Sequence, residues 1–164
     1  MGRGRGCVGE NRPVPRIVLY EHEIRQNVGN VARTAAATES ELHLVRPFGF
    51  RWGDPRLKRA GLDYWSHVRY TLHDSWAAFL ETLPAGARVW AFSTKAEKSL
   101  FEVRFHPDDY LLFGPETRGL PDAVLDRFPA LQIPMPGPVR SLNLAVSVGV
   151  VAYEVLRQQE ASGC

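Results

Sequence analysis

The segment from Asn27 to Arg33 reads NVGNVAR and is the first that could act on a ligand. On a helix, residues three apart share a face, so Asn27, Asn30 and Arg33 would form one polar stripe. A helix N-cap at Asn27 followed by a solvent-facing arginine explains the same residues. The stripe alone leaves both interpretations open.

A second candidate segment, GPETRGLP, occupies residues 114–121. Two glycines and two prolines in eight residues predict a rigid turn, and Gly114 would let a ligand approach the backbone closely. A plain strand-to-helix connection is the alternative. The segment has no GK[ST] sequence, so it is not a phosphate-binding loop of that type.

A third candidate segment, PMPGPVRSLNL, occupies residues 134–144. Arg140 comes just before a predicted helix, and Ser141 is the expected cap at a helix end that favours anions and hydrogen-bond acceptors. Asn143 and Ser147 lie four apart on this otherwise apolar helix and would form a polar seam. The alternative is that these are two ordinary polar residues at a helix start, with their hydrogen bonds formed within the protein.

Short apolar runs alternate with helical segments along the chain. We expect strands at residues 17–20, 41–45, 68–72, 88–93, 110–113 and 131–133, and helices at 27–38, 55–60, 75–83, 121–128 and 142–159. The strands are short and apolar on both faces, which predicts an α/β fold with a parallel sheet flanked by helices. In such sheets ligands bind beyond the carboxyl ends of the strands. The three candidate segments all follow predicted strands.

The length of 164 residues indicates one domain, and 45% hydrophobic with 23% charged residues excludes a disordered chain. Cys7 and Cys164, at opposite ends, cannot build a zinc site or a disulfide framework. No stretch is long and apolar enough for a membrane span, so we expect a cytoplasmic protein without membrane contact. Residues 1–15 are rich in glycine, arginine and proline and predict a flexible arm before a single domain at residues 16–160.

Residues 46–69 concentrate positive charge, with six arginines and lysines against two aspartates and thus a net charge of +4, above the +2 of the whole chain. Five aromatic residues interleave with these charges: Phe48, Phe50, Trp52, Tyr64 and Trp65. Cations for phosphates and aromatic faces for unstacked bases are what recognition of single-stranded RNA loops uses. A solvated basic segment with core aromatics remains the alternative.

Taken together, the motifs N-x-G-N-x-x-R, F-G-P-E-x-x-G-L-P and I-P-M…R-S-L-N-L…Y-E closely resemble the SPOUT class of RNA methyltransferases. The resemblance covers residues 17–158 and is strongest to the small tRNA 2′-O-methyltransferases that act on cytidine or uridine at the wobble position. It implies a SPOUT fold whose C-terminal part forms a deep trefoil knot. It further implies a homodimer with the active site at the subunit interface.

The resemblance also implies S-adenosyl-L-methionine as the cofactor, with no metal, and tRNA as the substrate. The positions that match cofactor contacts are Phe92, Gly114, Ile133, Met135, Ser141 and Leu142. Asn27, which would position Arg33, is a substrate-binding candidate, and the basic segment 46–69 independently adds Arg56, Lys58 and Arg59.

Three residues are the catalytic candidates: Arg33, Arg140 and Tyr153. Arg33 matches the residue assigned to activating the ribose hydroxyl. Because arginine is not deprotonated in proteins, we interpret it as a cation that orients the ribose and stabilises the developing alkoxide. Arg140 and Tyr153 are candidates for placing the nucleotide. The alternatives are a SPOUT enzyme acting on another tRNA position or on rRNA, and a non-catalytic RNA-binding protein with this fold.

Overall fold

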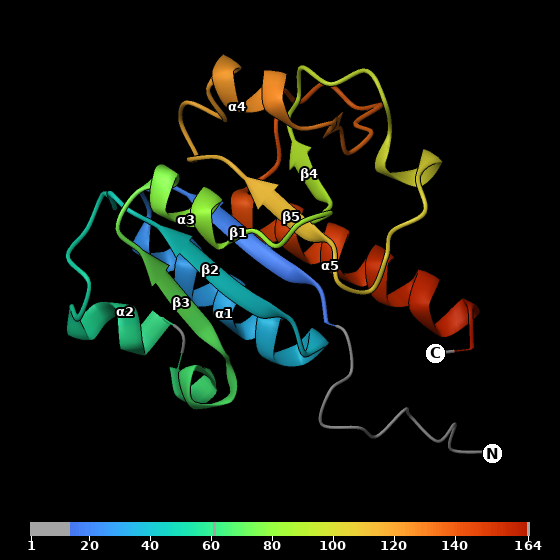
Figure 1. Cartoon of the computed structure of the whole chain (residues 1–164). Coiled ribbons are helices and arrows are strands. Elements are labelled where there is room, and N and C mark those ends of the chain that lie inside the picture. The colour runs from blue at the N-terminus through green and yellow to red at the C-terminus, as the bar shows by residue number, and fades with distance from the viewer. Residues whose placement is uncertain (1–13, 61, 164) are drawn as a thin grey trace.

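The computed structural model describes residues 14–60 and 62–163, and within this part six strands form one parallel sheet (Figure 1). The strands are β1 (Arg16–Tyr20), β2 (Glu41–Val45), β3 (Tyr70–His73), β4 (Val89–Phe92), β5 (Tyr110–Phe113) and β6 (Ala130–Leu131), and their order is β3-β2-β1-β5-β4-β6. All pairs are parallel. The predicted parallel α/β sheet is therefore confirmed.

Helices cover both faces of the sheet. The helices are α1 (Arg25–Thr38), α2 (Pro55–Ala60), α3 (Trp76–Thr82), α4 (Asp122–Arg127) and α5 (Leu144–Ala161), with 3-10 turns η1 (Leu62–His67) and η2 (Leu100–Glu102). Side chains alternate along β1: Ile17 packs with α1 and α5 in one core cluster, and Val18 packs with α3 and α4 in the other. In Figure 1, α1 and α5 lie together behind the sheet and α3 lies in front of it. No helix within the described residues is long and apolar enough to cross a membrane.

The predicted arm at residues 1–15 falls largely on residues 1–13, which lie outside the described part of the chain. Val14 and Pro15 are buried, and the Pro15 carbonyl accepts a hydrogen bond from the Glu41 N–H at 3.0 Å. Pro15 therefore continues the hydrogen-bonded pairing of β1 with β2 by one residue.

The start of α1 differs from the sequence prediction. The helix begins at Arg25 after an N-cap at Ile24, so the expected N-cap at Asn27 is wrong. The carboxylate of Glu116, from the loop after β5, accepts the backbone N–H groups of Glu23 (2.7 Å) and Ile24 (3.1 Å). A carboxylate distant in sequence thus binds at the helix end, where free N–H groups need acceptors.

The start of α5 also differs, because its N-cap is Asn143 and not the expected Ser141. The Asn143 side-chain oxygen accepts the N–H groups of Ala145 (2.9 Å) and Val146 (3.4 Å). The asparagine side-chain oxygen can reach these free N–H groups, which is why asparagine is favoured at the N-cap. Ser141 remains in the loop before the helix.

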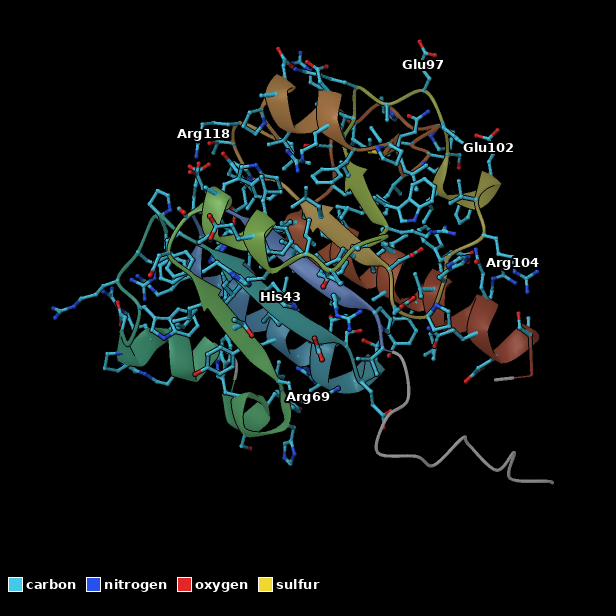
Figure 2. All side chains as sticks on the ribbon, in the orientation of Figure 1. His43, Arg69, Glu97, Glu102, Arg104 and Arg118 are labelled. Atoms are coloured by element: carbon cyan, nitrogen blue, oxygen red, sulfur yellow. The ribbon has the colours of Figure 1, made fainter. Side chains whose placement is uncertain are left out.

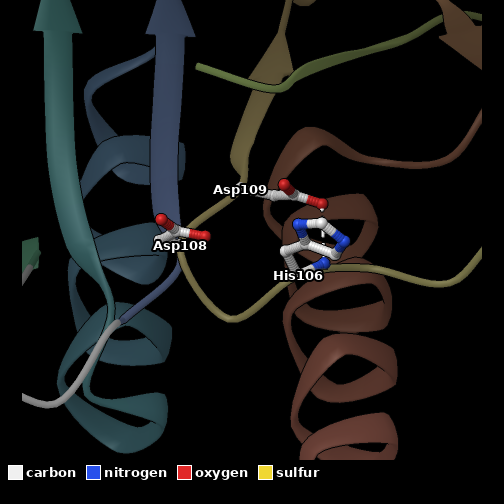
Figure 3. Close-up of side chains that lie close together, drawn as sticks. All are labelled: His106, Asp108 and Asp109. Atoms are coloured by element: carbon white, nitrogen blue, oxygen red, sulfur yellow. Dashed lines mark hydrogen bonds between the residues drawn. The ribbon is translucent and has the colours of Figure 1, made fainter. Parts of the chain in front are cut away.

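The amino ends of the strands are closed by a charged network around Asp109, which is 1% exposed. The Asp109 carboxylate accepts the backbone N–H of His106 at 2.9 Å and lies beside Asp108 (Figure 3). It also accepts the Trp90 indole N–H at 2.9 Å and pairs with Arg88 at 3.1 Å. Arg88 in turn lies 2.6 Å from the His106 ring nitrogen. Arg88 contacts both the Asp109 carboxylate and the His106 ring. The cluster therefore joins the loops at the amino ends of β4 and β5, on the side of the sheet opposite to the candidate loops.

Candidate functional site

A cleft of about 530 Å³ opens beyond the carboxyl ends of β4, β5 and β6. We call it the strand-end cleft. Its walls are residues 92–95 after β4, 113–120 after β5 and 140–144 before α5, with Ile133 and Met135 between them. All six positions predicted to touch the cofactor line it: Phe92, Gly114, Ile133, Met135, Ser141 and Leu142. The structure therefore brings together residues from three loops that are far apart in the sequence.

The strand-end cleft has an apolar floor and a tightly folded wall. The rings of Phe92 and Phe113 stack at 4.9 Å with an interplanar angle of 10°, at the ends of β4 and β5. A Cβ added to Gly114 would lie 2.5 Å from the Leu120 backbone nitrogen and 2.6 Å from the Gly119 carbonyl carbon. Only glycine lets the loop close on itself here. The cleft thus has buried aromatic side chains at its base and a closely packed loop as its wall.

A polar network ties the strand-end cleft to the start of α1. The Asn27 amide donates to Glu116 Oε1 at 3.2 Å, and its oxygen accepts the Asn143 amide N–H at 3.1 Å. Asn27 is buried and lines the cleft. We expected Asn27 to position Arg33, but its side chain forms other bonds. Its amide N–H donates to the loop after β5, and its oxygen accepts from the N-cap of α5.

A second cleft, of about 750 Å³, is lined by four arginines: Arg25, Arg33, Arg56 and Arg59. We call it the basic cleft. Glu23, Ile24, Gln26, Asn30, Gly49 and Phe50 complete its lining. Ile24 lines both clefts, so the two adjoin at the start of α1. Arg33 and the predicted phosphate contacts Arg56 and Arg59 meet here, while the Lys58 side chain lies outside the described part of the chain.

The arginines of the basic cleft are held in different ways. Asp54 pairs with Arg56 at 3.1 Å and with Arg25 at 3.5 Å. The side-chain hydrogen bonds from Arg56 hold the pKa of the Asp54 carboxyl below its usual range. Arg33 instead lies over the ring of Tyr64, with its Cζ atom 5.2 Å from the ring centroid. Among the described side chains, no carboxylate is paired with Arg33.

Glu23 and Ile24 form the wall between the clefts, and other loops contact this wall from both sides. The Thr117 hydroxyl donates to the Glu23 carboxylate at 2.7 Å, and this bond is the main reason that the Glu23 pKa lies below its usual range. Arg118, which is labelled in Figure 2, pairs with Glu23 at 3.8 Å and with Glu21 at 3.5 Å. On the other side, a Cβ at Gly49 would lie 2.6 Å from the Glu23 carbonyl oxygen. The loop after β2 therefore packs directly on this wall.

Two catalytic candidates lie outside the basic cleft. Arg140 lines the strand-end cleft. Tyr153 is 53% exposed on α5 and belongs to the lining of neither cleft within the described residues. Val146, two helical turns before Tyr153, is 52% exposed. One chain therefore does not bring Tyr153 to Arg33.

Most of the aromatic residues of segment 46–69 belong to the core, as the alternative of a solvated basic segment with core aromatics expected. Phe48, Phe50, Trp52 and Trp65 are partly buried and pack against the core cluster beneath α1. Phe50 also lines the basic cleft. Tyr64 contacts Arg33, a contact that the sequence reasoning missed. The sequence reasoning also missed that Glu116 accepts the N–H groups at the start of α1. The signal was available, because a carboxylate in a rigid turn with glycine and proline is held in a fixed position.

Comparisons with protein families, with known proteins and with solved structures agree. The model of the SpoU rRNA Methylase family matches residues 15–153. The tRNA (cytidine(34)-2′-O)-methyltransferase of Escherichia coli (strain K12) is 48% identical over 145 residues, which cover 87% of this chain and 92% of that protein.

Solved structures agree. One concerned with the 2-OH methylation of C/U34 on tRNA is 66% identical, with a TM-score of 0.89 over 91% of this chain and 98% of that chain. The SpoU methyltransferase AviRb from Streptomyces viridochromogenes, in complex with the cofactor AdoMet, shares the fold at 21% identity. Its TM-score is 0.83 over 94% of this chain and 61% of that chain.

Proposed function

This chain belongs to the SpoU rRNA Methylase family, and from its similarity to the tRNA (cytidine(34)-2′-O)-methyltransferase and to the structure concerned with C/U34 we propose that it methylates the 2′-hydroxyl of the wobble nucleotide, C or U at position 34, in tRNA. The observation that carries the proposal is the meeting of the two clefts at Ile24. One cleft holds the six predicted cofactor positions, and the other holds Arg33 among four arginines. A methyl donor and an RNA ribose bound there would meet at the shared wall.

The strand-end cleft fits S-adenosyl-L-methionine. Its volume is in the range of cofactor pockets, and its apolar floor suits a flat adenine ring. Phe92, Gly114, Ile133, Met135, Ser141 and Leu142 would hold the cofactor, and Gly114 keeps the space that a side chain would fill. When bound, this cofactor supplies a methyl group already activated on a sulfonium sulfur. No metal has a part in the proposed reaction.

Arg33 would act on the ribose hydroxyl. A 2′-hydroxyl is a weak nucleophile, so the protein must align it and stabilise the negative charge that grows on its oxygen. The Arg33 guanidinium is a fixed positive charge at the edge of the basic cleft, and it cannot serve as a literal base. We therefore assign it the orientation of the ribose and stabilisation of the alkoxide.

The remaining arginines of the basic cleft would hold the RNA backbone. Arg25 and Arg56 share Asp54, which fixes their side chains at the rim, and Arg59 is exposed beside them. Together with Lys58, which lies on α2, these residues offer cations to successive phosphates. Such contacts position an RNA without selecting its sequence.

A homodimer completes the proposed site. Val146 and Tyr153 are large, exposed and seven residues apart, so they share one face of α5. Pairing two copies through this face would cover it, and it would carry Tyr153 toward the nucleotide in the partner's site. Arg140 would then place the nucleotide from the strand-end side.

We also propose the deep trefoil knot for the C-terminal part and a cytoplasmic location. The knot rests on the resemblance of the three motifs to the SPOUT class; in the structure β6 lies at the sheet edge beside β4 and the following α5 packs on α1. The cytoplasmic location follows from the proposed tRNA substrate.

The proposal is tested by mass spectrometry of tRNA from a strain that lacks this gene. We expect the loss of one ribose methyl at the wobble nucleotide of one or a few tRNAs. The wild-type gene should restore the methyl and the Arg33→Ala variant should not. An unchanged wobble nucleotide, or a methyl lost from another position, would contradict the assignment.

A further inference from the structure

We propose that Tyr64 is a positioning residue for Arg33, an inference that rests on the function proposed above. The Arg33 Cζ atom lies 5.2 Å from the centroid of the Tyr64 ring. Among the described side chains, no carboxylate forms an ion pair with Arg33. The aromatic face is therefore the contact that the structure places at this guanidinium.

An aromatic face holds a cation differently from a carboxylate. The ring attracts the guanidinium through its negative face and leaves the N–H donors at the guanidinium edge available. A carboxylate would occupy those donors and offset the charge, as Asp54 does for Arg25 and Arg56. Tyr64 thus fixes Arg33 while keeping its charge and donors available for a ribose oxygen.

The position of Tyr64 is itself well anchored. It lies in η1, and the next residue, Trp65, donates its indole N–H to the Leu57 carbonyl at 3.4 Å. The Trp65 ring also packs edge-on against Trp52 at 5.7 Å and Tyr70 at 5.5 Å. These contacts tie η1 to α2 and β3, so the Tyr64 ring is presented to α1 from a fixed backbone.

The expected consequence is on the rate of the chemical step. A free arginine side chain samples several rotamers, and a guanidinium displaced by about 1 Å loses much of its effect on a transition state. Cofactor binding should be unaffected, because Tyr64 lies in η1 and does not line the strand-end cleft.

The test is single-turnover methylation of tRNA by the full chain at saturating S-adenosyl-L-methionine and saturating enzyme, with the tRNA Kd measured in parallel. We expect Tyr64→Leu to lower the single-turnover rate about three- to thirtyfold, the range for a lost cation–π contact, with the tRNA Kd within about twofold of wild type. Tyr64→Phe and Tyr64→Trp should stay within about twofold of the wild-type rate, because both keep an aromatic face.

Phe101→Leu is the control, because Phe101 is an aromatic residue in η2 that is 62% exposed and lines neither cleft. It should keep the wild-type rate. The role of Tyr64 would be overturned by an unchanged rate in Tyr64→Leu, an equal loss in Tyr64→Phe, an equal loss in Phe101→Leu, or a tRNA Kd raised as much as the rate falls. If Tyr64→Leu fails to fold, Tyr64→Phe and Tyr64→Trp still decide, because a rate loss in both contradicts the proposal. A wild-type chain that transfers no methyl would refute the proposed function itself, whatever the variants do.

Discussion

His22 should make the stability of this protein depend on pH in a defined window. The side chain is fully buried, and its ring lies 4.7 Å from the Phe48 ring and 5.4 Å from the Phe50 ring. Burial lowers the pKa of His22 from 6.5 to about 4, although the nearby Glu116 carboxylate acts in the opposite direction.

The sign follows from the two pKa values. Between pH 4 and 6.5 the unfolded chain binds a proton at His22 that the folded chain does not, so the free energy of unfolding falls as the pH falls. From pH 7 to pH 5 the loss amounts to about 2 kcal/mol for this one histidine. His43 and His73, whose pKa values burial also lowers, add to the slope of the wild-type chain.

The assay is urea unfolding of the wild-type chain and of His22→Phe at pH 7 and pH 5. Phenylalanine keeps the contact with Phe48 and Phe50 and removes the titrating group, so the variant should lose about 2 kcal/mol less than wild type between the two pH values. His67→Phe, the same substitution at an exposed histidine, serves as the matched control. An equal pH dependence in wild type and His22→Phe would refute the reasoning.

Three further predictions concern the two clefts. Glu116→Gln should lower the melting temperature by about 3–10 °C in a thermal unfolding scan, because one amide oxygen replaces a carboxylate that accepts three N–H groups; an unchanged melting temperature would show that these bonds are dispensable. Arg33→Ala should lower methyl transfer to tRNA at least about 100-fold with a nearly unchanged melting temperature, since the side chain is exposed; retained activity would remove its assigned role. Replacing Arg56, Lys58 and Arg59 together by alanine should reduce the slope of log Kd against log salt concentration for tRNA binding by about two units. The Kd of S-adenosyl-L-methionine should stay unchanged. A wild-type slope would show that these residues are solvated and do not contact phosphates.

The sheet and the strand-end cleft were predictable because their signals are local. Apolar runs such as residues 110–113 indicate buried parallel strands, and the rule that ligands bind beyond the carboxyl ends of such strands then places Gly114 and Ile133 at one edge. The resemblance supplied which positions in these loops would touch a cofactor. The structure gathers all of them in one cleft.

What could not be predicted depends on contacts between distant residues. Asn27 looked like an N-cap because local rules do not include Glu116, a carboxylate 89 residues away that binds at the helix start. The Tyr64 ring beneath Arg33 depends on how η1 packs on α1, which no periodicity encodes. Tyr153 has no place in the site of a single chain, and its proposed role depends on a second copy.

The central claim is that the basic cleft presents the 2′-hydroxyl of nucleotide 34 to a methyl donor in the strand-end cleft. It is tested most directly with the purified protein, S-adenosyl-L-methionine and two synthetic tRNAs that differ only in the ribose or 2′-deoxyribose at nucleotide 34. Mass spectrometry of the digested products should find one ribose methyl on nucleotide 34 of the first tRNA and none on the second. A methyl on a base, a methyl at another nucleotide, or equal methylation of the 2′-deoxy tRNA would contradict the claim.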